Sequence, residues 1–430
     1  MLLQFSFQNF KSFRDEAVLD MSATRISELT HHVITIGKEK ILPIALIYGA
    51  NASGKSNVIE AFSYMSRYVL YSFSYGGGEF NKRDSSIATK LKPFMLDKES
   101  SANESVFEVY FTDKVNEAES VYNYGFSILQ NEVAEEWLNY KAKASSNSFK
   151  KVFYRHKDDG ITFYDIPKQQ QENIQIALEK ETLIVSLGAM LKVKRLQEVR
   201  DWFHKNVIAN FGNPRSTYFM STMVPAGFTD NETVRQDVIK YLSAFDSSIV
   251  GFNLEVVEDE TEDKPAKLKI DALHRMNDSD SLASLPLSAE SDGTLKMFAL
   301  YPLLHKVLKN GATLFIDEMN ARLHPLLVRT IMILFLDREK NPNHAQLVFT
   351  THDTWQLSND MVRRDEIWLT EKGNDGASSL YSLVEFTDDN GVKIRKDENY
   401  EKNYLLGKYG AIPEMKSFGI LKEGDTNEGT

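Results

Sequence analysis

The stretch from Gly49 to Ser56 constrains this chain more than any other. It reads Gly-Ala-Asn-Ala-Ser-Gly-Lys-Ser and fits the pattern G-x-x-x-x-G-K-[ST] at every defined position. The apolar run 44–48 before it predicts a buried strand, and the apolar positions of 56–62 recur at helical spacing. A glycine loop in this context points consecutive backbone N–H groups at phosphate oxygens, beside the positive end of the helix. We therefore predict a phosphate-binding loop.

The residues of this loop divide by role. We expect Lys55 to reach the β- and γ-phosphates and the Ser56 hydroxyl to ligate Mg²⁺. The rest of the loop is expected to contact the nucleotide through its backbone and small side chains, namely Gly49, Asn51, Ala52, Ser53, Gly54 and Asn57.

Two further apolar runs end in polar residues suited to phosphate chemistry. The run 314–316 precedes Asp317 and Glu318. Asp317 is placed to hold Mg²⁺ through water opposite Ser56, and Glu318 is the natural base to polarise an attacking water. The run 346–351 precedes His352, which can sense a γ-phosphate by hydrogen bonding. Either pattern alone is common for structural reasons, but the paired strands favour a functional interpretation.

A helix start at 288–294 offers a second anion site. Ser291 and Gly293 precede apolar residues at helical spacing, and Asn310-Gly311 ends the pattern. Small residues at a helix N-terminus expose backbone N–H groups to an anion. An ordinary capped helix is the alternative interpretation.

Bulk properties exclude several classes of protein. The chain has 430 residues, no cysteine and a net charge of −11. The missing cysteines exclude disulfides, a thiol nucleophile and a cysteine-based zinc site. No apolar run approaches the ~18 residues of a membrane span, and the N-terminus lacks a basic leader region, so we expect a cytoplasmic protein. The acidic balance argues against a protein that coats nucleic acid by bulk charge.

The chain divides into three expected parts. Residues 1–166 hold the phosphate loop and strand-like runs whose spacing predicts an antiparallel meander. Residues 167–250 are expected to form an inserted, mainly helical lobe or lid. Residues 251–430 hold the Ser-x-Gly helix start, the acidic strand, the histidine strand and a C-terminal tail. The predicted fold class is α/β.

In this order, the motifs resemble those of the ATP-binding cassette (ABC) ATPases, in the branch with SMC, RecF and zinc-hook repair ATPases. The Glu290–Thr294 setting is similar to the abortive-infection ATPases related to RloA and AbiL. Further stretches resemble that group, namely 9–13, 323–325, 363–368 and 407–413. The resemblance implies an ABC-type P-loop domain with a mixed sheet and an antiparallel β subdomain, which binds ATP and Mg²⁺.

The resemblance also implies an assembly. Ser291 and Gly293 would contact the γ-phosphate held by a second subunit, and 320–324 would line the seam of a homodimer or a higher even oligomer. Some family features differ in this chain. The best candidate for the Q-loop glutamine is Gln130, after a predicted strand, and the long coiled coil and zinc hook are missing.

Three functions follow as hypotheses. In the first, ATP closes a dimer, hydrolysis opens it, and a separate nuclease-like effector responds during bacterial defence against phage. In the second, a RecF- or SMC-like repair ATPase clamps DNA; the acidic pI of about 5.5 favours the first. The third is a self-sufficient nuclease; we expect the 78 residues after His352 to be too few for the fused metal-nuclease domain of such enzymes, which disfavours this hypothesis.

Overall fold

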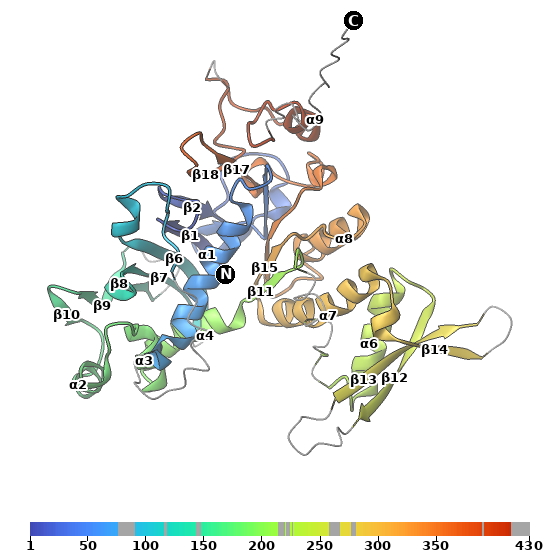
Figure 1. Ribbon diagram of the computed structural model, residues 1–430, viewed down its shortest axis with the longest axis horizontal. Helices are drawn as coiled ribbons and strands as arrows, with labels where there is room; N and C mark the ends of the chain where they lie inside the picture. Colours follow the sequence, from blue (N-terminus) through green and yellow to red (C-terminus); the bar gives the residue numbers. More distant parts are fainter. Residues whose placement is uncertain are drawn as a thin grey trace, which may run out of the picture.

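The computed structural model describes residues 1–75, 91–115, 118–142, 148–213, 220, 224–225, 227–257, 267–276, 281–388 and 391–413. In this part of the chain the fold is α/β, as expected, and two large sheets dominate it (Figure 1). Helix α1 (Lys55–Tyr71) packs between them, because Phe62 stacks on Phe315 of the one sheet and Tyr64 packs on Phe107 of the other.

The mixed sheet carries the predicted motif strands. Its order is β11-β15-β16-β5-β17-β18, and only the β17–β18 pair is antiparallel. Strands β5, β15 and β16 are wholly buried and mainly apolar, as a parallel sheet covered on both faces requires. The six strands are β5 (Ile44–Gly49), β11 (Val207–Asn210), β15 (Thr313–Asp317), β16 (Gln346–Thr350), β17 (Ile367–Lys372) and β18 (Ser378–Ser382).

Parallel pairing brings the carboxyl ends of five strands to one edge, and four of these ends concern the predicted site. Beyond these ends lie the phosphate loop after β5, Asp317 at the end of β15, His352 after β16 and Asn210 at the end of β11. Ligands of open α/β sheets bind outside this edge. The order and direction of the strands alone therefore place the predicted residues at the same edge of the sheet.

The second sheet is an antiparallel meander. Its order is β10-β9-β8-β7-β6-β1-β2. Gln130 and Asn131 form the two-residue turn between β7 and β8, with φ of 52° and 69°, as hairpin turns of this length demand. The strands are β1 (Leu2–Gln8), β2 (Ala17–Asp20), β6 (Ser105–Val115), β7 (Ala118–Leu129), β8 (Glu132–Lys141), β9 (Lys150–His156) and β10 (Gly160–Phe163).

The remaining elements divide between the two faces of the mixed sheet. One core, between the sheets, includes α2 (Lys168–Ala177), α3 (Ile184–Met190) and α4 (Lys194–Lys205). The other core includes α6 (Glu232–Ser243), α7 (Asp292–Asn310), α8 (Pro325–Leu336) and α9 (Tyr400–Leu405). Strand β15 contributes to both, because Phe315 faces the first core while Leu314 and Ile316 face the second.

Two smaller sheets complete the described strands. In Figure 1 the three-stranded sheet lies beside α6, away from the antiparallel meander. It comprises β12 (Ile249–Val257), β13 (Lys267–Arg275) and β14 (Leu282–Pro286), and the two-stranded sheet comprises β3 (Ile34–Ile36) and β4 (Glu39–Ile41). Short 3-10 helices occur at Thr30–His32, Ser72–Ser74, Ser100–Ala102, Leu287–Ala289, Thr354–Gln356 and Arg364–Glu366.

The range 167–250 does not form the single helical lobe that its periodicity suggested. Helices α2, α3 and α4 cover the antiparallel sheet with α1, β11 joins the mixed sheet, and α6 packs on β12 and α7. Helical spacing identifies an apolar face, but it does not tell which sheet that face covers. The domain boundaries at 166 and 250 stay predictions.

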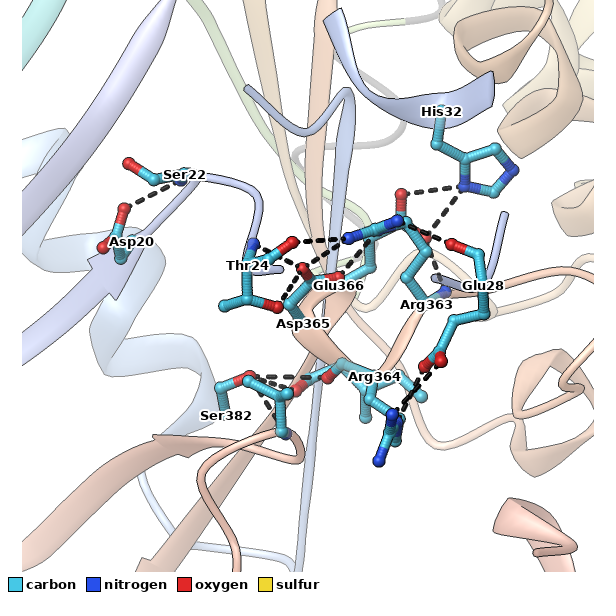
Figure 2. A network of polar contacts seen from close by, with 12 residues as sticks. Asp20, Ser22, Thr24, Glu28, His32, Arg363, Arg364, Asp365, Glu366 and Ser382 are labelled. Atoms are coloured by element: carbon cyan, nitrogen blue, oxygen red, sulfur yellow. Dashed lines mark hydrogen bonds and ion pairs between the residues drawn. The ribbon is translucent and has the colours of Figure 1, made fainter. Parts of the chain in front are cut away.

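A buried polar network fastens the N-terminal segment to the start of β17 (Figure 2). Arg363 has no exposed surface; its guanidinium donates to both oxygens of Asp365 at 2.9 and 2.8 Å and to the Glu28 carbonyl at 2.6 Å. Glu366 pairs with His32 at 2.9 Å, and Thr24 donates to Asp365 at 2.8 Å. Because β17 pairs with β5, this network supports the strand that carries the phosphate loop.

Candidate functional site

The phosphate loop is anchored at Ser53 and Gly54. The Ser53 and Thr370 hydroxyls lie 2.6 Å apart, which ties the loop to β17. Gly54 precedes α1 with φ of 114°, and a Cβ there would lie 2.7 Å from Ser378 Oγ, so this close approach requires glycine. The side chains of Asn51 and Ala52 are exposed, which leaves the outer rim of the loop open to a ligand.

Lys55 points into its own loop. Its ammonium donates to the carbonyl oxygens of Gly49 and Ala50, each at 2.8 Å, and the residue is buried. Burial lowers the pKa of Lys55 to about 8, whereas the nearby carboxylates of Glu318 and Asp317 act to raise it. An anion in the loop would therefore meet a desolvated cation that is already in place.

Asp317 is the centre of the polar contacts at the sheet edge. Its Oδ1 accepts hydrogen bonds from Ser56 Oγ at 3.0 Å and Thr350 Oγ1 at 2.7 Å, and its Oδ2 accepts one from Asn210 Nδ2 at 3.1 Å. A carboxylate and a hydroxyl are hard oxygen ligands of the kind that Mg²⁺ prefers. Ser56 and Asp317 thus fit the predicted metal site.

Glu318 follows in a constrained conformation. It has φ of 55°, its N–H donates to Thr350 Oγ1 at 2.8 Å, and a Cβ at Gly212 would lie 3.0 Å from its Cδ. Positive φ is strained for a residue with a side chain and persists where the surroundings enforce it. The carboxylate lies within electrostatic range of Lys55 and His352, so it can accept a proton beside the phosphate site.

His352 lies at the same edge. Its backbone N–H donates to Asn320 Oδ1 at 3.2 Å, which connects it to the loop after Glu318. Burial and the Lys55 charge lower the pKa of His352, while Glu318 and Asp317 act in the opposite direction. The lowered pKa favours the neutral imidazole, which can donate one hydrogen bond to a phosphate oxygen.

Ser291 and Gly293 lie at the start of α7, beside the loop after Glu318. Ser291 Oγ accepts the Thr294 N–H at 3.1 Å as an N-cap, and a Cβ at Gly293 would lie 3.5 Å from the Arg322 carbonyl. Arg322 also pairs with Asp292 at 2.7 Å. In the part of the chain that the structure describes, no hydrogen bond or ion pair joins Ser291 or Gly293 to 49–57.

The structure adds residues that the sequence did not single out. Thr350 holds both acids, Asn210 holds Asp317, and Ser12 accepts a hydrogen bond from Asn57 Nδ2 at 2.7 Å. The sequence signal that marks Asp317 also marks Asn210, since each is a polar residue that directly follows a short apolar run. Asn210 ends β11 beside Asp317, whereas Gln130, the Q-loop candidate, lies in the hairpin turn between β7 and β8.

Comparison with known proteins supplies a family. A family model described as "AAA domain, putative AbiEii toxin, Type IV TA system" matches residues 44–354, which is more than half of the chain. No curated protein matches the chain. None of the described helices combines the length and the hydrophobicity that a membrane span needs.

Proposed function

Because the chain belongs to the AAA-domain family described as putative AbiEii toxins of type IV toxin–antitoxin systems, we propose that it hydrolyses ATP at the site formed by Lys55, Asp317 and Glu318. One observation carries the proposal. Ser56 Oγ and Asp317 Oδ1 lie 3.0 Å apart, and the next residue, Glu318, brings a possible base to the same edge. This is the set of groups that phosphoryl transfer to water needs.

Each side chain has one task in this proposal. Lys55 turns from the carbonyls of Gly49 and Ala50 to the β- and γ-phosphate oxygens. Ser56 and Asp317 hold Mg²⁺, which when bound neutralises phosphate charge. Glu318 orients and polarises the attacking water, and neutral His352 donates a hydrogen bond to the γ-phosphate.

We propose that ATP binding and hydrolysis switch the protein between a closed dimer and an open one. Ser291 and Gly293 offer an anion site that contacts the loop after Glu318 and not the phosphate loop of the same chain. This arrangement supports a composite site in which one subunit's Ser291 and Gly293 meet the γ-phosphate held by the other. Residues 320–324 then line the seam, and hydrolysis opens the dimer.

The proposed setting is bacterial defence, with a separate nuclease-like effector that responds to the closed dimer. The family description, which names a toxin–antitoxin system, supports this setting. The net charge of −11 supports a protein partner over a DNA clamp.

Turnover by a Glu318→Gln protein tests the proposal. The amide keeps the shape but cannot accept a proton, so ATP hydrolysis should fall by ~10²-fold or more while ATP still binds. Glu339→Gln, an exposed position in the turn that follows α8, is the matched control and should keep wild-type turnover. A Glu318→Gln protein that hydrolyses ATP at the wild-type rate contradicts the assigned role.

A further inference from the structure

Lys296 in α7 is a buried lysine whose partners are backbone carbonyls. Only 1% of its surface is exposed, and its ammonium donates to the Met319 and Ala321 oxygens, each at 2.7 Å. A third contact reaches the Glu318 carbonyl at 3.4 Å, and the ammonium lies 4.4 Å from the centre of the Phe211 ring. Burying a charge is costly, so these contacts and the nearby Glu318 carboxylate, which acts to raise the Lys296 pKa, must offset that cost.

The loop that Lys296 holds begins at the proposed base. Glu318 and Arg322, at its two ends, have φ of 55° and 62°, so the loop turns twice through conformations that side chains disfavour. Lys296 binds carbonyls between these two turns. Its contacts therefore fix the backbone on which the Glu318 carboxylate depends, while Thr350 fixes the Glu318 N–H from the other side.

The same two turns of α7 carry the proposed anion site. Ser291 and Lys296 are five residues apart, and Asp292 pairs with Arg322 at 2.7 Å at the far end of the loop. The Phe211 contact adds a third element, because Phe211 follows Asn210 and its N–H donates to the Asp317 carbonyl at 3.0 Å. Any shift of the start of α7 must therefore move this loop or break buried hydrogen bonds.

We propose that Lys296 is a positioning residue that couples the start of α7 to Glu318, so that a phosphate bound at Ser291 and Gly293 sets the base of the same subunit. This inference rests on the proposed function. Lys296 does not touch the nucleotide. It transmits the position of α7 through its three carbonyl contacts, and its loss lowers kcat while ATP binding at Lys55 persists.

Chemical rescue tests this role, because the chain has no cysteine of its own. The thiolate of a Lys296→Cys protein, unfolded in urea, displaces bromide from 2-bromoethylamine and forms S-aminoethylcysteine, which restores the ammonium at nearly the same length. Iodoethane gives the matched thioether without the charge. Both proteins and similarly treated wild type are refolded, and kcat, KM, ATP affinity and thermal unfolding are measured.

The ethylated protein should lose at least ~10-fold in kcat, with KM and ATP affinity within ~3-fold of wild type, and the aminoethyl protein should recover most of the kcat. Lys306→Met, an exposed lysine on the same helix, should leave all values unchanged. If refolding fails, Lys296→Met made without refolding is expected to show the same loss of kcat with ATP affinity retained.

Two results would overturn the inference. The first is an equal kcat for the ethylated and aminoethyl proteins. If the two modified proteins do not refold, a wild-type kcat for Lys296→Met counts as the same result. The other is a parallel loss of ATP affinity and kcat, which marks a general structural role. If Glu318→Gln abolishes turnover while Lys296 can be replaced freely, the coupling fails and the proposed function stands. If Glu318→Gln has no effect, the proposed function itself fails.

Discussion

Thr350 and Asp317, on neighbouring parallel strands, are joined by a hydrogen bond of 2.7 Å from Thr350 Oγ1 to Asp317 Oδ1. The same hydroxyl accepts the Glu318 N–H at 2.8 Å. One buried side chain therefore orients the proposed metal ligand and the backbone of the proposed base. The strand that ends near His352 thus also positions the two acids.

Replacement of Thr350 by valine tests this dual role. Thr350→Val keeps the shape but removes both hydrogen bonds, which leaves the Glu318 N–H without its acceptor. We expect ATP turnover to fall by ~10-fold or more, since small displacements of catalytic groups are costly. Thr350→Ser, which keeps the hydroxyl, is the control and should retain most of the activity. Wild-type turnover in the valine protein would show that this bond is dispensable.

Lys55→Ala tests nucleotide binding. The change removes the lysine charge expected at the β- and γ-phosphates, so ATP affinity should drop at least ~10-fold, or about 1.4 kcal/mol. Titration of labelled ATP measures the difference, with exposed Lys157→Ala as the control. Equal affinities for the Lys55→Ala and wild-type proteins would rule out the assignment of the phosphate loop.

Gly293→Asp tests the anion site at α7. The space beside Gly293 admits a Cβ at ordinary contact distance, and an acid in the first turn suits the helix dipole, so the protein should fold. The new carboxylate repels a γ-phosphate. We expect ATP binding through Lys55 to persist and hydrolysis to be lost, whereas neutral Gly293→Asn should lose less. Full activity of Gly293→Asp would remove the site from the mechanism.

Mixing this protein with Lys55→Ala extends the test to two subunits. Each mixed dimer contains one site with both defects and one with neither, so some hydrolysis should return. Absence of recovery, despite demonstrated subunit exchange, would count against composite sites that act independently.

Much of the site could be predicted because it lies where apolar runs end. The runs before Gly49, Asp317 and His352 are strands of one parallel sheet, and its topology brings their ends together. Asn210 was missed because its apolar run has only three residues and directly follows a helix. Thr350 and Lys296 act through hydrogen bonds to other elements, and no local pattern in the sequence predicts such contacts.

For the range 167–250, the sequence pattern predicted helices but not the elements on which they pack. Trp202 and Phe203 gave a clear helical face, and both pack on Phe62 of α1. Periodicity could not reveal that these residues belong to a core shared with residues before 150, because that depends on contacts distant in sequence. Gln130 was chosen for its place after a strand, but its positive φ marks a turn residue.

The buried Glu136 should make stability depend on pH. It accepts the N–H groups of Ile184 and Val185 at 2.7 and 3.1 Å, and burial raises its pKa to about 7. Since the folded pKa exceeds the usual 4.5, the folded state binds this proton more tightly, and its stabilising effect is full below pH 4.5 and lost as pH rises through 7. The rise from 4.5 to about 7 corresponds to at most about 3 to 4 kcal/mol.

Comparison with Glu136→Gln isolates this effect. The amide does not titrate, although it leaves one of the two N–H groups without an acceptor. The free energy of unfolding of wild type relative to the variant should fall between pH 4.5 and 7, measured by denaturant titration at several pH values. A difference that stays constant across this range would contradict the prediction.

In the proposed switch, ATP joins two copies of this chain through Lys55 of one and Ser291 and Gly293 of the other. The most direct test is the mass of the Glu318→Gln protein in sedimentation, since this variant should retain bound ATP. With Mg²⁺ and ATP we predict a particle of twice the 49.1 kDa of the single chain, and with Mg²⁺ and ADP the single chain. A mass that is the same with ATP and ADP would contradict the ATP-dependent dimer.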